Sequence, residues 1–211
     1  FSPELTIVNT ATPTIYNDLA VAKSVKGETG SRIALIGVHV TGAHREGIKE
    51  EGIDFVIRRE PEETARRLAR AINRKKELRN VAGITYKDRG KAVVNPDRPL
   101  IGNLDELPFP DRDIVDNSRY RMPFTREPFT LINVSRGCPF SCIYCTASLY
   151  YGKKVRTRDP ARVVNEIEVC VKKYGIRNFL FWADNATWDR AGMEKICSKI
   201  RKKNLRIRWF C

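Results

Sequence analysis

The chain has 211 residues and a hydrophobic fraction of 42%, enough for one large or two small domains with sizeable cores. No stretch reaches the ~18 apolar residues of a membrane span and no secretion signal is visible, so we expect a cytoplasmic protein. The net charge of +14 is spread over amphipathic helices without a recognition motif, so we expect no nucleic-acid partner. Because Phe1 is not an initiator methionine and the chain stops at Cys211, straight after a strand-like stretch, we expect an internal fragment of a longer protein.

Residues 1–80 alternate between short apolar runs and amphipathic stretches. The apolar runs predict buried strands at Leu5–Thr10, Arg32–Gly37 and Phe55–Arg58. The stretches after them predict helices, with a loop through Gly42 before the second: Tyr16–Lys26, Ala43–Glu51 and Glu62–Lys76. Strand–helix alternation of this length indicates an α/β fold with a Rossmann-like parallel sheet.

Residues 81–128 have the composition of a connection between domains. Ile84–Lys87 and Lys91–Asn95 flank Asp88-Arg89-Gly90, which predicts a hairpin. Six prolines then follow, and they predict a linker: Pro96, Pro99, Pro108, Pro110, Pro123 and Pro128. We expect its segment Leu104–Pro110 to be extended along a surface.

Residues 129–211 again alternate between strand and helix patterns. The predicted strands are Phe129–Val134, Asn178–Ala183 and Leu205–Phe210, and the predicted helices are Ala161–Tyr174 and Asp189–Lys203. Asp159 and Pro160 are a capping residue and a first-turn proline for the first helix. Three such units in order are typical of part of an open barrel, whose active site lies at the carboxyl ends of its strands.

Three cysteines follow the first of these strands at the spacing C-x3-C-x2-C: Cys138, Cys142 and Cys145. Thiolates this close together favour zinc or an iron–sulfur cluster. A zinc site normally has four ligands, whereas the nearest further cysteine, Cys170, falls on a predicted helix and both histidines lie far upstream. Three ligands without a fourth favour a [4Fe–4S] cluster whose fourth iron is open to an outside ligand.

These residues resemble the radical S-adenosylmethionine (SAM) superfamily, whose signature is C-x3-C-x-aromatic-C. Cys138, Cys142, Tyr144 and Cys145 match it position for position. The resemblance implies a partial radical SAM (β/α)6 barrel over residues 129–211. It also implies that SAM binds the open iron through its amino and carboxylate groups and is cleaved to a 5′-deoxyadenosyl radical. The backbone next to Tyr144 would contact the adenine.

A second stretch, Phe181–Asp189, is similar to the F-x-D-D-x-F-T-x-D pattern of cobalamin-type radical SAM enzymes, with Ala183 and Ala186 as departures. The resemblance implies that Asp184 and Asn185 bind the SAM amino group. Asp189 is alternatively the N-cap of the next helix. Arg156 and Arg158 match a family R-x-R pattern, and they either meet the SAM carboxylate or anchor the loop.

The N-terminal part resembles the cobalamin-binding domain that precedes radical SAM domains. The matching stretches are Thr10–Thr14, Ile36–His39 and Asp54–Thr64, where Arg59 and Pro61 stand in place of family glycines. The resemblance implies that Thr10, Thr12 and Gly37 surround the nucleotide tail of cobalamin. His39 lies in an H-x-x-G sequence but lacks the aspartate that orients a cobalt-binding histidine, so we do not expect it to bind cobalt.

The remaining cysteines do not point to a metal site. Cys170 and Cys197 fall on apolar helix faces, where free cysteine packs as a small hydrophobe, and Cys211 ends the chain.

Together the resemblances imply a fragment of a cobalamin-dependent radical SAM enzyme that performs methyl transfer or oxidative cyclisation at an unactivated carbon. Its cofactors would be a [4Fe–4S] cluster, SAM and cobalamin. Its partners would be a small-molecule or lipid-like substrate and an electron donor such as ferredoxin or flavodoxin. One alternative is a radical SAM methylthiotransferase acting on RNA or a ribosomal protein, although no cysteine precedes Cys138 to hold a further cluster. The other is a non-enzymatic, zinc-clipped nucleic-acid-binding module.

Overall fold

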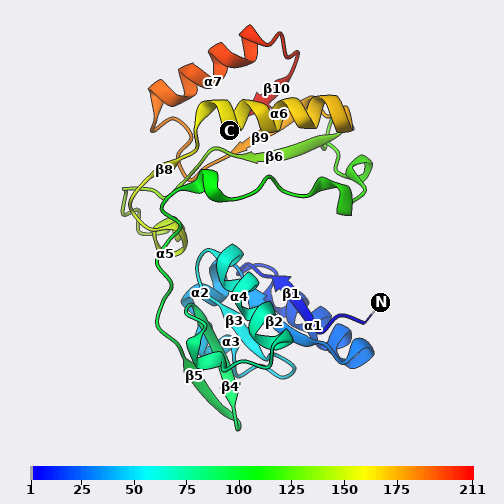
Figure 1. Cartoon of the computed structure of the whole chain (residues 1–211), viewed down its shortest axis with the longest axis vertical. Coiled ribbons are helices and arrows are strands. Elements are labelled where there is room, and N and C mark those ends of the chain that lie inside the picture. The colour runs from blue at the N-terminus through cyan, green and yellow to red at the C-terminus, as the bar shows by residue number, and fades with distance from the viewer. Residues whose placement is uncertain (1) are drawn as a thin grey trace. The chain divides into compact units, whose positions relative to one another are not determined.

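The computed structural model describes residues 2–211 and divides into two compact units (Figure 1). The first unit runs to Leu100 and also includes Ser141–Tyr151. The second unit comprises Ile101–Phe140 and Gly152–Cys211. Both units are mixed α/β structures with parallel strands, so the predicted fold class is confirmed. No helix among the described residues is long and apolar enough to cross a membrane.

The first unit is built on a five-stranded sheet with the strand order β1-β2-β3-β4-β5. Its strands are β1 (Leu5–Asn9), β2 (Arg32–Ile36), β3 (Phe55–Ile57), β4 (Ile84–Asp88) and β5 (Lys91–Val94). The first three are parallel, as the sequence predicts. The hairpin of β4 and β5, which the sequence placed in the connecting segment, pairs antiparallel with β3 and extends this sheet.

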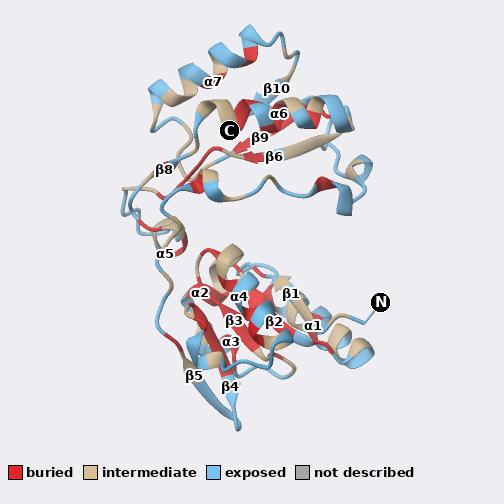
Figure 2. Cartoon of the chain, viewed as in Figure 1, coloured by how far each residue is buried: buried red, intermediate tan, exposed pale blue. Residues whose placement is uncertain are grey.

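Helices cover both faces of this sheet, which explains why its central strands β2 and β3 are apolar runs. The helices are α1 (Ile15–Thr29), α2 (Val38–Gly42), α3 (His44–Gly47) and α4 (Pro61–Asn73). Successive residues of β2 serve the two faces: Ile33 packs in a cluster with Ala22 of α1, and Ala34 packs in another with Leu68 of α4. Figure 2 shows the buried residues of the first unit concentrated in β2 and β3.

The segment between β2 and β3 differs from the prediction of a loop followed by one helix. It forms two short helices instead, α2 and α3, separated at Ala43. The α2 helix begins directly after Gly37, whose carbonyl accepts hydrogen bonds from the backbone and the hydroxyl of Thr41.

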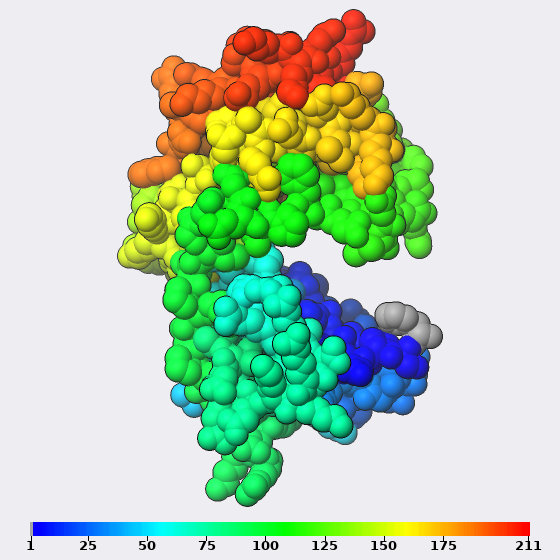
Figure 3. Space-filling model, in the orientation of Figure 1, coloured from blue at the N-terminus to red at the C-terminus, as the bar shows by residue number. Residues whose placement is uncertain are grey.

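The second unit contains a three-stranded parallel sheet with the order β10-β9-β6. Its strands are β6 (Phe129–Asn133), β9 (Asn178–Trp182) and β10 (Arg208–Phe210), so the third strand is shorter than predicted. The helices α6 (Pro160–Tyr174) and α7 (Arg190–Lys202) pack side by side, and Figure 3 shows their yellow and orange-red surfaces in contact. Both cover the sheet face that carries Ile132, Phe179 and Phe181.

The predicted linker is not simply extended, because it contains three 3-10 turns: Leu104–Glu106, Arg112–Ile114 and Asn117–Arg119. Each turn is opened by a short polar side chain that accepts a hydrogen bond from the backbone two residues later, namely Asn103, Asp111 and Asp116. A fourth such turn, Leu78–Asn80, lies in the first unit.

The cysteine loop is bracketed by two short paired strands, β7 (Ser135–Arg136) and β8 (Arg156–Thr157), which sequence periodicity cannot detect at two residues each. A one-and-a-half-turn helix, α5 (Ala147–Tyr151), follows the third cysteine and was also not predicted. By its contacts α5 belongs with the first unit, where it packs against α2.

Candidate functional site

The three motif cysteines lie on an irregular loop after β6, and none forms a disulfide. Cys138 is partly buried, whereas Cys142 and Cys145 are exposed. The backbone of Cys138 donates to the Gly152 carbonyl (3.1 Å). Among residues 2–211, no three Cys, His, Asp or Glu side chains are gathered in a ligand geometry. What fits an iron–sulfur cluster is the donor set itself: three free thiols within eight residues on an accessible loop.

Gly137, directly before the first cysteine, has a backbone conformation that favours glycine, with φ 96°. A Cβ at this position would lie 2.3 Å from the Lys154 carbonyl oxygen. The Gly137 amide donates a hydrogen bond to Oδ2 of Asp184 at 2.7 Å. The start of the cysteine loop is therefore fixed by backbone geometry and by a carboxylate from the end of β9.

Asp184 follows β9 and is partly buried. Burial raises the pKa of its carboxyl group, while the hydrogen bond from Gly137 and the charges of Arg156 and Arg136 oppose that rise. Its neighbour Asn185 accepts from the Thr187 hydroxyl through Oδ1 at 3.3 Å. Of the two predicted SAM ligands, Asp184 thus has one oxygen committed to the cysteine loop, and Asn185 is held in the following turn.

The two predicted arginines have different surroundings, although both are largely buried. Arg156 faces Arg136 across the β7–β8 pair and donates to the Ile101 carbonyl at 2.6 Å. Arg158 donates from Nη1 to the Asn133 carbonyl (2.9 Å) and to Oε2 of Glu166 (2.7 Å). These contacts favour the anchoring alternative for Arg158.

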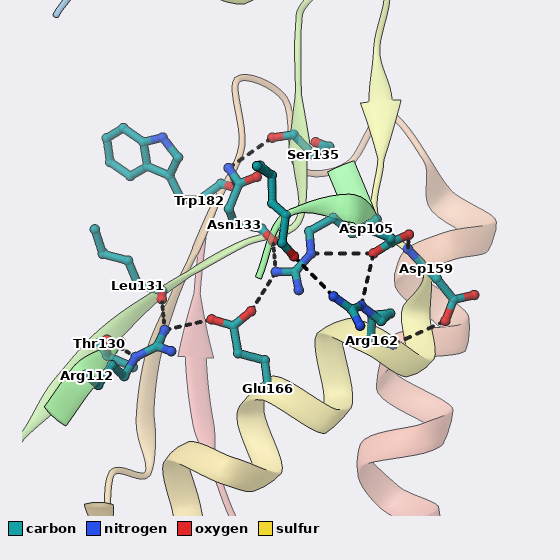
Figure 4. Close-up of polar contacts among 12 residues, drawn as sticks. Asp105, Arg112, Thr130, Leu131, Asn133, Ser135, Asp159, Arg162, Glu166 and Trp182 are labelled. Atoms are coloured by element: carbon teal, nitrogen blue, oxygen red, sulfur yellow. Dashed lines mark hydrogen bonds and ion pairs between the residues drawn. The ribbon is translucent and has the colours of Figure 1, made fainter. Parts of the chain in front are cut away.

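Glu166, which sequence reasoning missed, is the centre of a buried ionic network (Figure 4). Its side chain is 1% exposed. Oε1 forms an ion pair with Nη2 of Arg112 and Oε2 with Nη1 of Arg158, each at 2.7 Å. Arg112 also donates to the Leu131 carbonyl of β6 (3.0 Å). The sequence does contain a signal for it. Glu166 lies three residues after Val163, on the apolar face of a predicted helix, where a charged side chain needs a buried partner.

The linker residue Asp105 joins the same region. Its Oδ2 accepts from the Asp159 amide at 2.8 Å, and Asp159 in turn caps α6 through the amides of Ala161 and Arg162. The predicted capping role of Asp159 is confirmed. Phe109 lies beneath the Arg162 guanidinium at 5.0 Å, so the linker is attached to the start of α6.

The structure shows the surroundings of three further residues that the sequence analysis singled out. Asp189 accepts from the Gly192 amide at 2.9 Å and is the N-cap of α7. Cys170 is fully buried in the core of the second unit, and burial raises the pKa of its thiol to about 11, so it stays protonated and is a poor metal ligand. Cys197 was expected in the core as well, but it is partly exposed and lines a surface groove with Met193 and Trp209.

In the first unit, the predicted cobalamin-facing residues lie at the carboxyl ends of β1 and β2. The Thr10 amide donates to the Ile36 carbonyl (2.9 Å), and its hydroxyl is buried without a hydrogen-bond partner. Gly37 has φ 116°, and a Cβ there would lie 2.1 Å from the Thr10 carbonyl oxygen. Glycine is therefore required by the approach of the Thr10 backbone, whatever ligand lies nearby.

Thr12 and His39 meet across the same edge, with 3.1 Å between the Thr12 hydroxyl and Nδ1 of His39. Thr12 is exposed. Tyr144, the aromatic residue of the cysteine motif, is 87% exposed, so its ring is not held by packing. The structure thus brings together Thr10 with Gly37 and Thr12 with His39 in one unit, and Asp184 with the start of the cysteine loop in the other.

Comparison with known proteins agrees with this architecture. Residues 132–211 match the model of the radical SAM superfamily. An uncharacterized methyltransferase of Pyrococcus horikoshii is 33% identical over 211 residues, covering 99% of this chain and 46% of that protein. An anaerobic magnesium-protoporphyrin IX monomethyl ester cyclase of Rubrivivax gelatinosus is 31% identical over 215 residues, covering 98% of this chain and 38% of the cyclase.

Among solved structures, the radical SAM methyltransferase TsrM from Kitasatospora setae, with cobalamin and a [4Fe-4S] cluster bound, has a TM-score of 0.77 at 18% identity. The match covers 99% of this chain and 44% of TsrM. The chain therefore has the fold of part of that enzyme, and it spans less than half the length of the relatives it matches.

Proposed function

We propose that this chain, which belongs to the radical SAM superfamily through residues 132–211, is part of a cobalamin-dependent radical SAM enzyme that performs methyl transfer or oxidative cyclisation. One observation carries the proposal. The C-x3-C-x2-C loop starts at the carboxyl end of a parallel β-strand, the edge at which barrel enzymes place their chemistry.

In this proposal Cys138, Cys142 and Cys145 hold the [4Fe–4S] cluster as thiolates. When bound, the cluster supplies the electron that cleaves SAM to a 5′-deoxyadenosyl radical. The backbone beside Tyr144 would contact the adenine, and Asp184 and Asn185 would bind the SAM amino group. Arg156 and Arg158 are the candidates for the SAM carboxylate, and the ion pair of Arg158 with the buried Glu166 supports an anchoring role for Arg158.

The first unit would bind cobalamin at the carboxyl ends of β1 and β2. Neighbouring parallel strands end at one edge, and ligands of open α/β sheets bind at that edge. Thr10, Thr12 and Gly37 all lie there. The unpartnered Thr10 hydroxyl supports this assignment, since a buried polar group without a partner is costly unless a ligand or water reaches it.

The remaining parts of the proposal concern partners and compartment. The substrate would be a small molecule, as for the cyclase among the relatives. An external electron donor such as ferredoxin or flavodoxin would reduce the cluster. The six free cysteines support a reducing compartment, and we place the protein in the cytoplasm.

Anaerobic reconstitution with iron and sulfide tests the cluster assignment. We expect a [4Fe–4S] absorption and electron paramagnetic resonance spectrum, and iron close to four atoms per chain because each thiolate is needed to hold the cluster. Cys142→Ala should lose most of that iron. Cys197→Ala is the matched control, because Cys197 is a partly exposed thiol outside the motif, and it should keep the full spectrum.

The identity of the bound metal also distinguishes the radical SAM enzyme from the zinc-clipped module. A colourless protein that binds one zinc ion in place of iron would favour the zinc-clipped module. A full cluster retained in Cys142→Ala would show that Cys142 is not a ligand and would overturn the three-cysteine assignment.

A further inference from the structure

Asp184 makes a contact within the polypeptide that the binding of SAM would not require. Its Oδ2 accepts a hydrogen bond of 2.7 Å from the backbone amide of Gly137. The two residues are 47 positions apart, one at the end of β9 and the other in the loop after β6. Since β6 and β9 are neighbouring parallel strands, this bond links their carboxyl ends beyond the last pair of the ladder, Asn133 and Trp182.

The backbone around Gly137 leaves little freedom. Its φ of 96° is accessible chiefly to glycine, and the Lys154 carbonyl oxygen lies 2.3 Å from where a Cβ would be. The next amide, that of Cys138, donates to the Gly152 carbonyl at 3.1 Å. The backbone of Gly137 and Cys138 is thus held by two hydrogen bonds. One goes to Asp184, after β9, and the other to Gly152, before β8.

A carboxylate is a strong acceptor for such a backbone amide. Charge-assisted hydrogen bonds are about twice as strong as neutral ones. Burial raises the pKa of Asp184, and the hydrogen bond from Gly137 and the charges of Arg156 and Arg136 oppose that rise. The 2.7 Å contact itself is what equips Asp184 to fix the loop.

We propose that Asp184 is a positioning residue that fixes the backbone of Cys138 for cluster binding, and that it does so by accepting the Gly137 amide. The inference deepens the proposed function and rests on it. It differs from the assignment of Asp184 as a SAM ligand, because the contact exists within the polypeptide and requires no SAM. Asn185 then remains as the side chain for the SAM amino group.

Two substitutions separate the roles. Asp184→Asn keeps an oxygen that can accept the Gly137 amide but removes the charge, whereas Asp184→Ala removes the acceptor. If Asp184 positions the loop, Asp184→Asn should bind nearly as much cluster as the wild type. Asp184→Ala should bind less, because its loop is no longer fixed. A SAM ligand that acts through its charge predicts loss of SAM affinity in both variants, with the loop and the cluster unaffected.

The first measurement is hydrogen exchange of residues 135–140 in the cluster-free full chain, followed by mass spectrometry. Asp184→Ala should speed exchange at the Gly137 amide by about tenfold or more, and Asp184→Asn by only a few-fold, as expected for losing or weakening a bond to a charged group. Asp189→Ala is the matched control, because this carboxylate on the same connection caps α7 and does not touch Gly137. It should leave this exchange unchanged.

The second measurement is iron content and SAM affinity after anaerobic reconstitution. Asp184→Ala should retain less than half the wild-type iron, and Asp184→Asn close to all of it. Unchanged exchange in Asp184→Ala would overturn the inference, and so would fast exchange with full iron. Loss of SAM affinity in both variants with normal exchange and iron would return Asp184 to the SAM site.

The two proposals can fail separately. If the wild-type chain takes up no cluster, the proposed function fails, and the exchange data alone decide whether Asp184 holds the loop. If Asp184→Ala does not fold, Asp184→Asn still tests the contact. Its exchange at Gly137 should rise by only a few-fold and its iron content should stay close to that of the wild type, and loss of the cluster with an unchanged rate at Gly137 would overturn the inference.

Discussion

Arg59 has a left-handed backbone, with φ 61°, at a position where the similar cobalamin-domain motif has glycine. A residue with a Cβ pays about 1 kcal/mol for this conformation. The conformation is held by the Arg59 amide, which donates to the Thr41 hydroxyl at 2.9 Å, while the side chain makes one long contact of 3.3 Å with the Leu149 carbonyl. We predict that Arg59→Gly raises the free energy of unfolding by about 0.5–1 kcal/mol, measured by urea denaturation.

Arg59→Ala is the matched control for that prediction. It removes the same side-chain contact but keeps the Cβ, so it should not stabilise the protein. If Arg59→Gly and Arg59→Ala have equal stabilities, the strain at this residue is negligible.

At the scale of single residues, sequence reasoning succeeded where the determinant is local. Asp159 and Asp189 cap helices because a short carboxylate precedes a helical pattern. It could not find the reason for Gly37, because the Thr10 carbonyl that excludes a side chain is 27 residues away in the chain. For the same reason, no local signal indicated that Asp184 bonds to Gly137.

The helix α6 is attached to the linker and to β6 by one buried carboxylate, Glu166. Removing one partner of a buried ionic group leaves the others uncompensated, at about 3–5 kcal/mol. We therefore predict that Glu166→Ala lowers the free energy of unfolding by about 3–5 kcal/mol, because it leaves the buried guanidinium groups of Arg112 and Arg158 without their carboxylate partner. Chemical denaturation monitored by circular dichroism measures the loss.

Glu168, two residues later on the same helix, provides the comparison. It forms ion pairs with Lys172 and Lys203, which hold the pKa of its carboxyl group at about 2, but these pairs are at the surface. Glu168→Ala should change stability little, because exposed ion pairs are screened by water. A Glu166→Ala variant as stable as Glu168→Ala would show that the buried network contributes nothing net.

At the scale of elements, long periodic segments were predicted well and short ones were not. The strands β1, β2, β6 and β9 and the helices α1, α4, α6 and α7 all agree with the sequence patterns to within a few residues. The paired strands β7 and β8 have two residues each, and α2 and α5 have five each, too few to show a period. The helix predicted at Ala43–Glu51 is present only as the shorter α3. The unpredicted pieces flank the cysteine loop and the end of β2, where function is expected.

For the whole molecule, the sequence predicted an α/β fold in two parts but not how the chain is shared between them. The hairpin Ile84–Val94 joins the first sheet, because β4 completes the open edge of β3. The segment Ser141–Tyr151 belongs with the first unit although the residues on either side belong with the second. Such long-range assignments depend on tertiary contacts that no window of sequence contains.

The largest-scale prediction concerns cobalamin in the full-length protein. The loop after β1 and the first turn of α2 meet at Thr12 and His39, at the edge where the cofactor would bind. We expect bound cobalamin without a histidine on cobalt. No aspartate precedes His39 to orient its ring, and its Nδ1 lies beside the Thr12 hydroxyl. The cobalt(II) resonance spectrum should therefore lack splitting from an imidazole nitrogen and should be unchanged in His39→Ala.

A probe of the same edge must avoid Gly37, where any side chain would strike the Thr10 carbonyl and disturb the fold itself. Thr12→Phe places added bulk at an exposed position beside His39, and it should weaken cobalamin binding by about tenfold or more. Ser24→Phe adds the same ring at an exposed position on α1 and should leave the affinity unchanged. Nitrogen splitting that disappears in His39→Ala would make His39 the cobalt ligand. Equal affinity in both phenylalanine variants would move the cofactor away from this edge.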